Sequence, residues 1–296
     1  MNYKCLVSGI RLDAYLADYL NISRNKVQKM IRNDLILVNN KKVNASYIVK
    51  VNDDVYVKEI LEENKDVNPV NIPLDIIYED DDLLVINKKS GMVVEPAPGH
   101  YDDTLANAIL AYLGDSSALR SIRYGIVHRL DKDTSGVMLV AKNDFTYRAL
   151  VDMLANRKVE KHYLALVDGV LEHDIGTIDA PIGRDINNRK KMAVTDCNSK
   201  EAVTHFKVLK RFKKATYVEC ILETGRTHQI RVHMAYIGHK ILNDPVYGKG
   251  KTSEFGQMLH SKSIKFIHPR TLKELYFEVD VPKEFKEKLE ELEKYE

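Results

Sequence analysis

The sequence predicts an α+β fold, in which a mixed, mostly antiparallel sheet with flanking helices follows a small α/β domain. Predicted strands outnumber predicted helices, and the two do not alternate in the regular β-α-β order of a parallel sheet. The first 57 or so residues form a separate pattern. Beyond it, strands are predicted at 74–78, 83–86, 137–142, 202–209 and 216–222. Helices are predicted at 104–113, 145–154 and 282–296. The last helix is rich in Lys and Glu and is expected to be solvated.

Length and composition bound the kind of protein. A chain of 296 residues with 44% hydrophobic content can form one large domain and one small one. It has no apolar run of the about 18 residues that span a bilayer and no secretion signal at its N-terminus, so we expect a soluble cytoplasmic protein with no membrane partner. Three scattered cysteines suit neither a disulfide framework nor a zinc cluster. The net charge of +2 indicates no nucleic acid by itself, so an RNA surface would need local clustering.

The N-terminal pattern predicts two short helices and a few strands. Apolar residues at helical spacing predict a helix at 11–20, and Ser23 is a candidate N-cap for a second helix at 24–31. Strands follow at 34–38, 41–43 and 53–57, the first two joined by an Asn-Asn turn.

This N-terminal region is basic, with nine Lys and Arg against five Asp in residues 1–57. Four of the basic residues lie on or near the second helix and suit phosphates: Arg24, Lys26, Lys29 and Arg32. The charges alone would be more typical of a solvated helix face. The order of elements, however, resembles the alpha-L RNA-binding domain first recognised in a small-subunit ribosomal protein, which favours RNA contact. Asn33-Asp34 and Asn52-Asp53 stand where that domain often has glycine, and Asn and Asp tolerate a left-handed backbone.

The segment that follows has the character of a linker. Residues 58–73 lose periodicity, gain charge and contain two prolines. We therefore predict an RNA-binding domain at 1–60, a linker at 61–73 and a second domain at 74–296.

The most distinctive stretch of the second domain is HRLDKDTSG at residues 128–136. Apolar residues at 126–127 and 137–142 predict a strand before it and a buried strand after it, with a tight loop between them. Asp131 in this loop should be either a satisfied turn acceptor or a carboxylate kept ionised for chemistry. The last four residues alone would indicate an ordinary turn.

This stretch resembles the signature of the large-subunit type (RluA/RluD) of RNA pseudouridine synthases, in which the Asp after Arg-Leu is catalytic. Further blocks resemble the same family in the family's order: KHYLALVDG at 161–169, GRTHQIRVH at 225–233, DPVYG at 244–248, and QMLH at 257–260 with FIHP at 266–269. The loop NKKSGMVVEP at 87–96 departs from the family, which usually has proline at Lys89 and histidine at Glu95. The resemblance implies a mixed, mostly antiparallel sheet and a pseudouridine synthase, an isomerase that requires no cofactor.

The reaction that the resemblance implies breaks the bond from the anomeric carbon of the ribose to the base nitrogen. The uracil turns and rejoins through carbon 5, without net redox change or hydrolysis. A carboxylate beside the ribose is needed as nucleophile or as base, and the resemblance assigns this role to Asp131. An aspartate has a reference pKa of about 3.9, which burial raises unless a cation compensates. The resemblance gives Arg231 as that cation, whose guanidinium could hold the carboxylate bidentately.

Tyr163 is the third catalytic candidate. On an alternating strand Lys161 and Tyr163 share a face while His162 points away, so both could approach one pocket and contact RNA there. Tyr163 could stack on the uracil and hold the detached ring, with a core tyrosine as the alternative.

Four more residues are candidate RNA contacts. Arg129 could fill the gap left by a flipped uridine or form a structural ion pair with a nearby acid. Arg226 could meet a phosphate. His228 and Gln229 could position RNA, although a histidine in such a loop is more often a structural hydrogen-bonder. No tight His/Asp/Glu spacing indicates a metal site.

Two classes of function remain open. One is a site-specific pseudouridine synthase, and the other is a non-catalytic RNA-binding or ribosome-assembly protein with a vestigial pocket. Asp131, Tyr163 and Arg231 together favour the enzyme, because a binding protein would need none of them. The N-terminal RNA module points to large-subunit (23S) ribosomal RNA, with transfer RNA as the alternative. We expect a monomer without an obligate protein partner.

Overall fold

The computed structural model describes residues 1–20, 22, 24–60, 67–188, 191–248 and 252–294. The chain divides into two compact units, Met1–Asp66 and Val67–Glu296. The second unit begins at Val67 rather than at residue 74, because Val67 is buried in its core and the Asn107 side chain donates to the carbonyl of Asn68 (2.8 Å). The remainder of the predicted linker, residues 61–66, lies outside the described residues.

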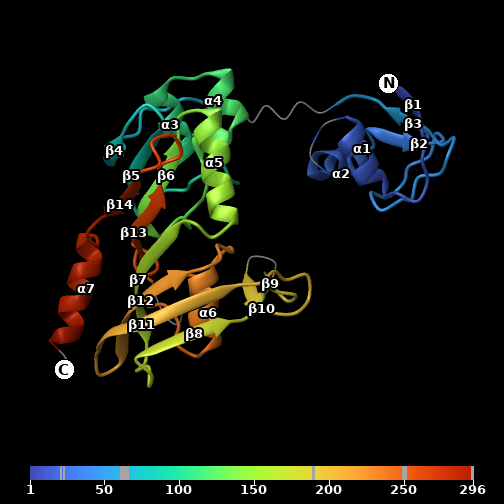
Figure 1. Cartoon of the computed structure of the whole chain (residues 1–296). Coiled ribbons are helices and arrows are strands. Elements are labelled where there is room, and N and C mark those ends of the chain that lie inside the picture. Colours follow the sequence, from blue (N-terminus) through green and yellow to red (C-terminus); the bar gives the residue numbers. More distant parts are fainter. Residues whose placement is uncertain (21, 23, 61–66, 189–190, 249–251, 295–296) are drawn as a thin grey trace. The chain divides into compact units, whose positions relative to one another are not determined.

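The first unit packs two helices on a three-stranded antiparallel sheet. Its elements are β1 (Asn2–Lys4), α1 (Leu12–Tyr19), α2 (Arg24–Arg32), β2 (Ile36–Val38) and β3 (Asp54–Val57), and the strand order is β1-β3-β2 (Figure 1). Apolar residues at helical spacing on α1 and α2, among them Leu12, Leu16, Val27 and Met30, are fully buried against the sheet. The two predicted helices and two of the predicted strands are confirmed, whereas β1 was not predicted.

The turns of the first unit use Asn and Asp in place of glycine. Asn39 and Asn40 have φ of 51° and 61°, as expected for a tight turn built on an Asn-Asn pair. Asp34 and Asn52 are also left-handed, with φ of 58° and 69°. These polar residues therefore supply the backbone that glycine commonly supplies in this kind of domain.

Two expectations for the first unit had other outcomes. The strand predicted at 41–43 is wrong: Lys41 makes one isolated bridge with Val38, because the lysines that begin this segment give it little apolar surface to bury on the sheet. Ser23, the candidate N-cap, lies outside the described residues.

The second unit is built on one large sheet with helices on both faces. Its strands are β4 (Ile76–Glu79), β5 (Leu83–Lys88), β6 (Ser135–Ala141), β7 (Glu160–Asp168), β8 (Ile175–Asp179), β11 (Val203–Arg211), β12 (Ala215–Leu222), β13 (Leu259–Ile267) and β14 (Glu274–Glu278), and β9 (Ile182–Arg184) with β10 (Met192–Val194) forms a separate hairpin. Its helices are α3 (Leu105–Leu113), α4 (Ser117–Ser121), the 3-10 turn η1 (Arg123–Gly125), α5 (Asp144–Ala155), α6 (Gln229–Tyr236) and α7 (Lys283–Glu293).

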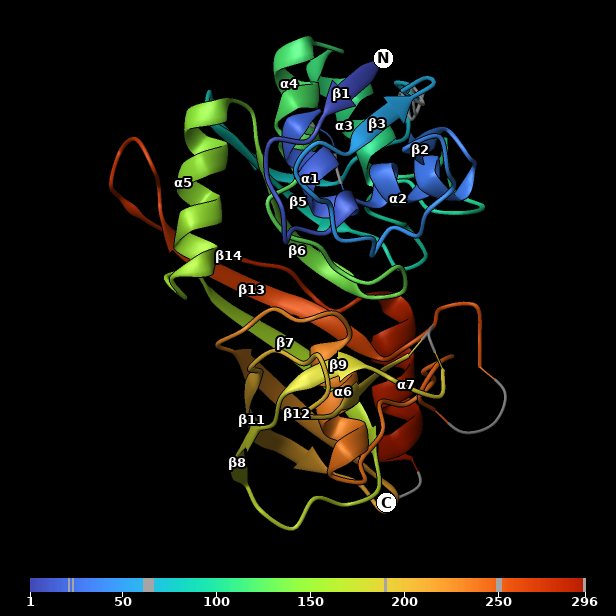
Figure 2. The same cartoon turned by 90° about the vertical axis from the view of Figure 1, so that its right-hand side faces the viewer.

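The sheet is mixed and mostly antiparallel, as predicted. Its order is β4-β5-β6-β13-β7-β12-β11-β8, with β14 on a further edge of β13. The pair β6–β13 is parallel, and the other pairs along this sheet are antiparallel. Figure 2 shows β13 and β7 crossing the middle of the unit, between β6 on one side and β12 on the other.

Helices bury both faces of the β5–β6 region. Leu84, Ile86 and Met138 face the core that α3 completes, and Leu83, Val85, Val137 and Leu139 face the core that contains Leu150 of α5. All seven residues of β6 are buried, which is why this strand reads as a continuous apolar run. In Figure 1, α3, α4 and α5 gather at the β4–β6 end of the sheet and α6 lies by β11 and β12.

Two local predictions for the second unit are corrected. Residues 126–127 form no strand; Ile126 makes an isolated bridge with Val140, because the chain has just left a left-handed turn in which Arg123, Tyr124 and Gly125 have φ of 52°, 60° and 77°. The C-terminal helix α7 is not wholly solvated, since Phe285 is fully buried. Among the described residues, no helix has both the length and the apolar character needed to cross a membrane.

Candidate active site

Asp131 lies in the turn that precedes β6. The N–H of Thr134 donates to the Asp131 carbonyl (3.1 Å), and Gln257 Nε2 donates to the Thr134 hydroxyl (3.0 Å). The turn closes at Gly136, with φ of 113°, where a Cβ would lie 2.1 Å from the carbonyl oxygen of Ser261 on β13. Glycine is therefore required at the point where the turn joins the sheet.

Lys88, at the end of β5, supports the same turn. Its buried ammonium donates to the carbonyls of Lys132 (2.9 Å), Lys89 (2.8 Å) and Met92 (2.9 Å). Burial lowers the pKa of Lys88 to about 7, against the opposing charges of Asp133 and Asp131. The divergent loop that begins at Lys89 is thus tied to the turn that carries Asp131.

Arg231 of α6 joins two carboxylates. Its Nη1 donates to Asp131 Oδ2 (2.7 Å), while Nε and Nη2 donate to Asp244 Oδ2 (2.8 Å) and Oδ1 (2.9 Å). Burial opposes the charge on the guanidinium, but its hydrogen bonds and ion pairs with Asp244 and Asp131 raise the pKa of Arg231 above its usual value. Arg231 is therefore a permanent cation that holds one oxygen of the Asp131 carboxylate.

The predicted bidentate pair with Asp131 is corrected by this geometry. The guanidinium fork lies on Asp244, whose Oδ1 also accepts the N–H groups of Val246 and Tyr247, so Asp131 receives a single bond from Arg231. No role was predicted for Asp244. The DPVYG block at 244–248 could have indicated one, because an acid that precedes a proline turn can be oriented by the N–H groups of that turn.

Tyr163 and Lys161 project from β7 towards Asp131, and His162 projects away from it, as the alternation predicted. Tyr163 and Lys161 are 7% and 8% exposed, whereas His162 bonds Glu160 and Glu219 on the other side. Burial raises the pKa of Tyr163 to about 12, so its hydroxyl keeps its proton. Burial also lowers the pKa of Lys161.

A cavity of about 470 Å³ opens beside Asp131 and Tyr163. Asp131, Tyr163 and Lys161 line it, and its rim carries Arg129 and Arg226. Its volume lies within the range of about 300–1,000 Å³ that is typical of small-molecule sites, which is ample for one nucleoside. Two carboxylates line it, Asp131 and Glu223, and Glu223 is paired with Arg157 (2.9 Å). The several cations around Asp131 suit a ribonucleotide whose phosphates lie at the rim.

Glu95, in the divergent loop, lies between two arginines of the rim. Its Oε1 accepts from Arg123 Nη2 (2.6 Å), and its Oε2 lies 3.8 Å from Arg129 Nη1. The Arg129 side chain remains 61% exposed. Both readings of Arg129 thus have a physical basis, because the side chain has an acidic partner and is also free enough to move.

Comparison with known proteins identifies the family. The sequence profile for RNA pseudouridylate synthase matches residues 82–236, and that for the S4 domain matches residues 10–55. The chain is 49% identical, over 96% of its length and 94% of the relative, to the uncharacterized RNA pseudouridine synthase YlyB of Bacillus subtilis (strain 168). It belongs to the RNA pseudouridine synthases.

Further relatives and solved structures agree. The ribosomal large subunit pseudouridine synthase D of Zymomonas mobilis is 40% identical over 93% of this chain and 92% of its own. The structure of human RNA pseudouridylate synthase domain containing 1 matches with a TM-score of 0.59 at 27% identity, covering 71% of this chain and 84% of that one. The predicted fold class and enzyme class are thereby confirmed, and the N-terminal unit is an S4 domain.

Among the predicted RNA contacts of this pseudouridine synthase, Gln229 is corrected. Its side chain is 3% exposed, and its amide group bonds Thr224, Thr204 and the backbone of Val203 and Arg226. Every bond of this amide is therefore internal, and Gln229 fastens the start of α6 to β11. Arg226 is partly exposed at the cavity, with its Nε on the carbonyl of Glu201 (2.8 Å).

The predicted RNA-binding residues of the S4 domain lie on or near the polar side of α2. Val27, Met30 and Ile31 are buried, while Lys29 and Arg32 are exposed. Lys26 is half-buried. Arg24 donates to the fully buried Asp13 (3.0 Å), so it also stabilises the domain.

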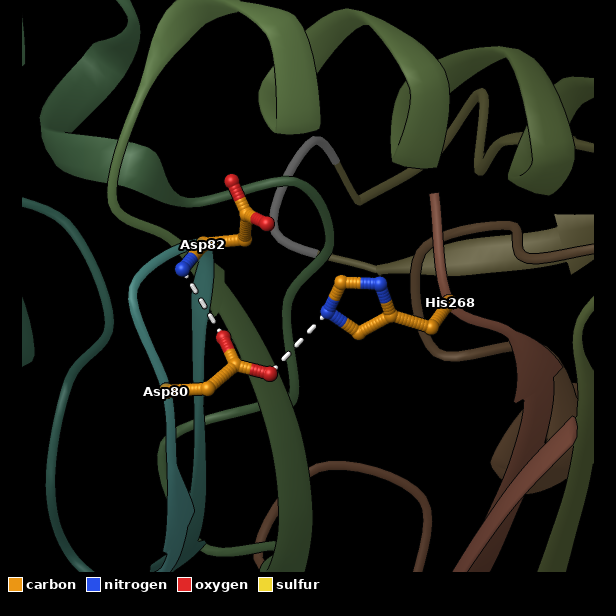
Figure 3. Close-up of side chains that lie close together, drawn as sticks. All are labelled: Asp80, Asp82 and His268. Atoms are coloured by element: carbon orange, nitrogen blue, oxygen red, sulfur yellow. Dashed lines mark hydrogen bonds and ion pairs between the residues drawn. The ribbon is translucent and has the colours of Figure 1, made fainter. Parts of the chain in front are cut away.

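A second cluster of carboxylates lies far along the sheet from the cavity, where Asp80, Asp82 and His268 come together (Figure 3). Their ligand atoms lie within 4.8 Å of one another. Arg270 pairs with both oxygens of Asp82 (2.6 and 2.7 Å), and His268 Nε2 lies 3.0 Å from Asp80 Oδ2. Protein donors already occupy these carboxylates, so the cluster ties the β4–β5 turn to the chain after β13 and offers no open ligand set for a metal.

Proposed function

We propose that this pseudouridine synthase isomerises specific uridines in large-subunit (23S) ribosomal RNA, acting as a monomer in the cytoplasm. Relatives at about 40% identity over most of the chain are named ribosomal large subunit pseudouridine synthase D. The S4 domain supplies a second, basic surface that a large structured RNA can contact. Transfer RNA is the alternative target.

The proposal assigns the chemistry to Asp131. The observation that carries it is the asymmetry of this carboxylate, which lines the same cavity as Tyr163: Arg231 holds Oδ2, while Oδ1 receives no hydrogen bond from the described residues. An ionised oxygen at that place can attack the anomeric carbon of the ribose or remove a proton from the sugar. If Asp131 attacks, its bond to C1′ forms as the C1′–N1 bond breaks and the uracil leaves with the bonding electron pair. After the ring has turned against Tyr163, C5 attacks C1′ and the Asp131–C1′ bond breaks. The proton lost from C5 is balanced by the proton that N1 gains, so the reaction is an isomerisation.

The target uridine has to leave its stack to reach this carboxylate, because a side chain in a tight turn cannot enter a stacked helix. Arg129, exposed at the cavity rim, is the side chain that would occupy the vacated place in the stack.

The test is a map of pseudouridines in ribosomal and transfer RNA from cells that carry the gene, lack it, or carry only Asp131→Asn. We expect one or a few large-subunit sites to vanish in both the deletion and the variant strain. Loss of sites in transfer RNA alone would move the target to that class. Identical maps in all strains would favour the non-catalytic binding protein.

A further inference from the structure

His228 occupies an unusual position directly beside the proposed catalytic carboxylate. It is the residue before α6, with φ of 58° and ψ of 21°, a left-handed conformation that is uncommon outside glycine but that histidine, like asparagine and aspartate, adopts more often than most residues. Its side chain is 19% exposed, and its Nε2 lies 3.9 Å from Asp131 Oδ1. This is the oxygen that Arg231 leaves unbonded.

The other ring nitrogen of His228 is fixed by Tyr247. The Nδ1 atom lies 2.9 Å from the Tyr247 hydroxyl, and the two rings meet edge to face at 5.6 Å. The N–H of Met192, on β10, donates to the same hydroxyl oxygen (2.9 Å). Because an N–H can only donate, the Tyr247 oxygen is an acceptor there and its own proton remains available for His228.

The protonation of His228 follows from this chain of hydrogen bonds. Burial lowers its pKa, with Asp131 and Asp244 opposing that shift and Arg231 and Arg129 adding to it, so the imidazole is neutral at neutral pH. A neutral ring carries one proton. If Tyr247 donates to Nδ1, that proton is on Nε2 and points towards Asp131, and each donor in the chain has an acceptor.

We propose that His228 is a positioning residue whose Nε2–H holds Asp131 Oδ1 when uridine enters, with Tyr247 setting the tautomer. This inference rests on the proposed role of Asp131. A movement of about 1 Å shortens 3.9 Å to a hydrogen bond, after which Arg231 and His228 fix the plane of the carboxylate from its two oxygens. The hairpin β9–β10 is then connected to Asp131 through Met192, Tyr247 and His228.

The experiment compares His228→Asn, His228→Gln and Tyr247→Phe in the full chain, with RNA from the deletion strain as substrate. The Gln amide nitrogen can replace Nε2–H, whereas Asn is too short to reach Asp131. We expect His228→Asn to lose about 10²-fold in kcat with KM for RNA unchanged, and His228→Gln to recover most of that loss. His239→Gln, at the other end of α6, where Nδ1 lies 2.9 Å from the Asp168 carbonyl, is the matched control and should retain the parent rate.

Nitrogen-15 spectra of histidine-labelled protein provide a readout that a purely structural role would not move. The His228 signal, identified by its loss in His228→Gln, should show a neutral ring protonated on Nε2, and in Tyr247→Phe it should shift towards a mixture of tautomers. An Nδ1 proton in the parent overturns the proposal. So does parent-like kcat in His228→Asn, equal loss in Asn and Gln, or a higher KM with kcat unchanged, which would indicate an RNA contact instead.

The same assays distinguish failure of the proposed role of Asp131 from failure of the His228 inference. If Asp131→Asn is as active as the parent, or the parent forms no pseudouridine, the catalytic assignment fails before His228 is tested. If Asp131→Asn is inactive and His228→Asn matches the parent, the His228 inference alone is wrong.

Discussion

The second unit contains two sites that each include two aspartates, one arginine and one histidine: Asp131, Asp244, Arg231 and His228 in one, and Asp80, Asp82, Arg270 and His268 in the other. In the β4–β5 cluster, Asp80 Oδ1 accepts the N–H groups of Asp82 and Leu83, and its Oδ2 bonds Tyr78 and His268. In the candidate active site, Asp244 is bonded in the same complete way, but Asp131, which lines the cavity, receives one side-chain hydrogen bond from the described residues, on Oδ2. A satisfied carboxylate stabilises the fold, and an incompletely bonded one at a cavity is available for chemistry.

The largest expected difference between the two sites is in turnover. Asp131→Asn keeps the shape of the side chain but removes its charge, so pseudouridine formation should fall by about 10³-fold or more while RNA affinity and the free energy of unfolding change little. Single-turnover assays with synthetic large-subunit RNA fragments, beside urea unfolding, measure both quantities. Turnover within a few fold of the parent would show that Asp131 is only a turn-forming residue.

Removing the cation should damage both properties. Arg231→Ala strands the buried Asp244 and frees Asp131, so we expect a loss of about 3–5 kcal/mol in unfolding free energy together with loss of activity. Arg231→Lys is the control, because it keeps the charge but cannot bond both carboxylates as the guanidinium does. A stable Arg231→Ala protein would mean that the two carboxylates do not depend on this arginine.

The β4–β5 cluster should respond in stability alone. Asp82→Asn weakens the contacts with Arg270 and should cost about 1–3 kcal/mol, while the folded fraction keeps its turnover. The hydrogen bond with Arg270 holds the pKa of Asp82 below its ordinary value. Stability from a lowered pKa is fully present above the unfolded value of about 3.9 and is lost as pH falls through the folded pKa. The difference in unfolding free energy between the parent and Asp82→Asn should therefore decrease between pH 5 and pH 3, as urea titrations can measure. A difference that stays constant over this range would contradict this account.

The same comparison shows what could be predicted from the sequence. Apolar periodicity located β6, β12, α3 and α5, because burial dictates those patterns. The proximity of Asp131, Tyr163 and Arg231 was anticipated from motifs that lie up to 100 residues apart. The sequence could not predict which partners these side chains bond. The guanidinium of Arg231 bonds Asp244 with two nitrogens, and the amide of Gln229 bonds only internal groups, because the orientation of α6 sets both. The left-handed turn before Ile126 was also invisible, because Arg123 and Tyr124 are not residues that prefer it.

The smallest expected effect concerns the acid that the divergent loop adds to the rim of the active site. Glu95 draws Arg123 and Arg129 together, and both are half or more exposed, so RNA phosphates must compete with its carboxylate for them. Glu95→Gln removes that competition without changing the size of the side chain. Because exposed ion pairs contribute only about 0–1 kcal/mol, we expect RNA affinity to rise no more than about fivefold at low salt, with the gain fading as salt increases. Filter binding of the parent and variant across a salt series measures this. Glu274→Gln, which removes an acid paired with Lys265 outside the cavity lining, is the matched control and should keep the parent affinity. Equal affinity for parent and Glu95→Gln at low salt would mean that the two arginines already meet RNA without displacing Glu95, so that the acid only supports the loop.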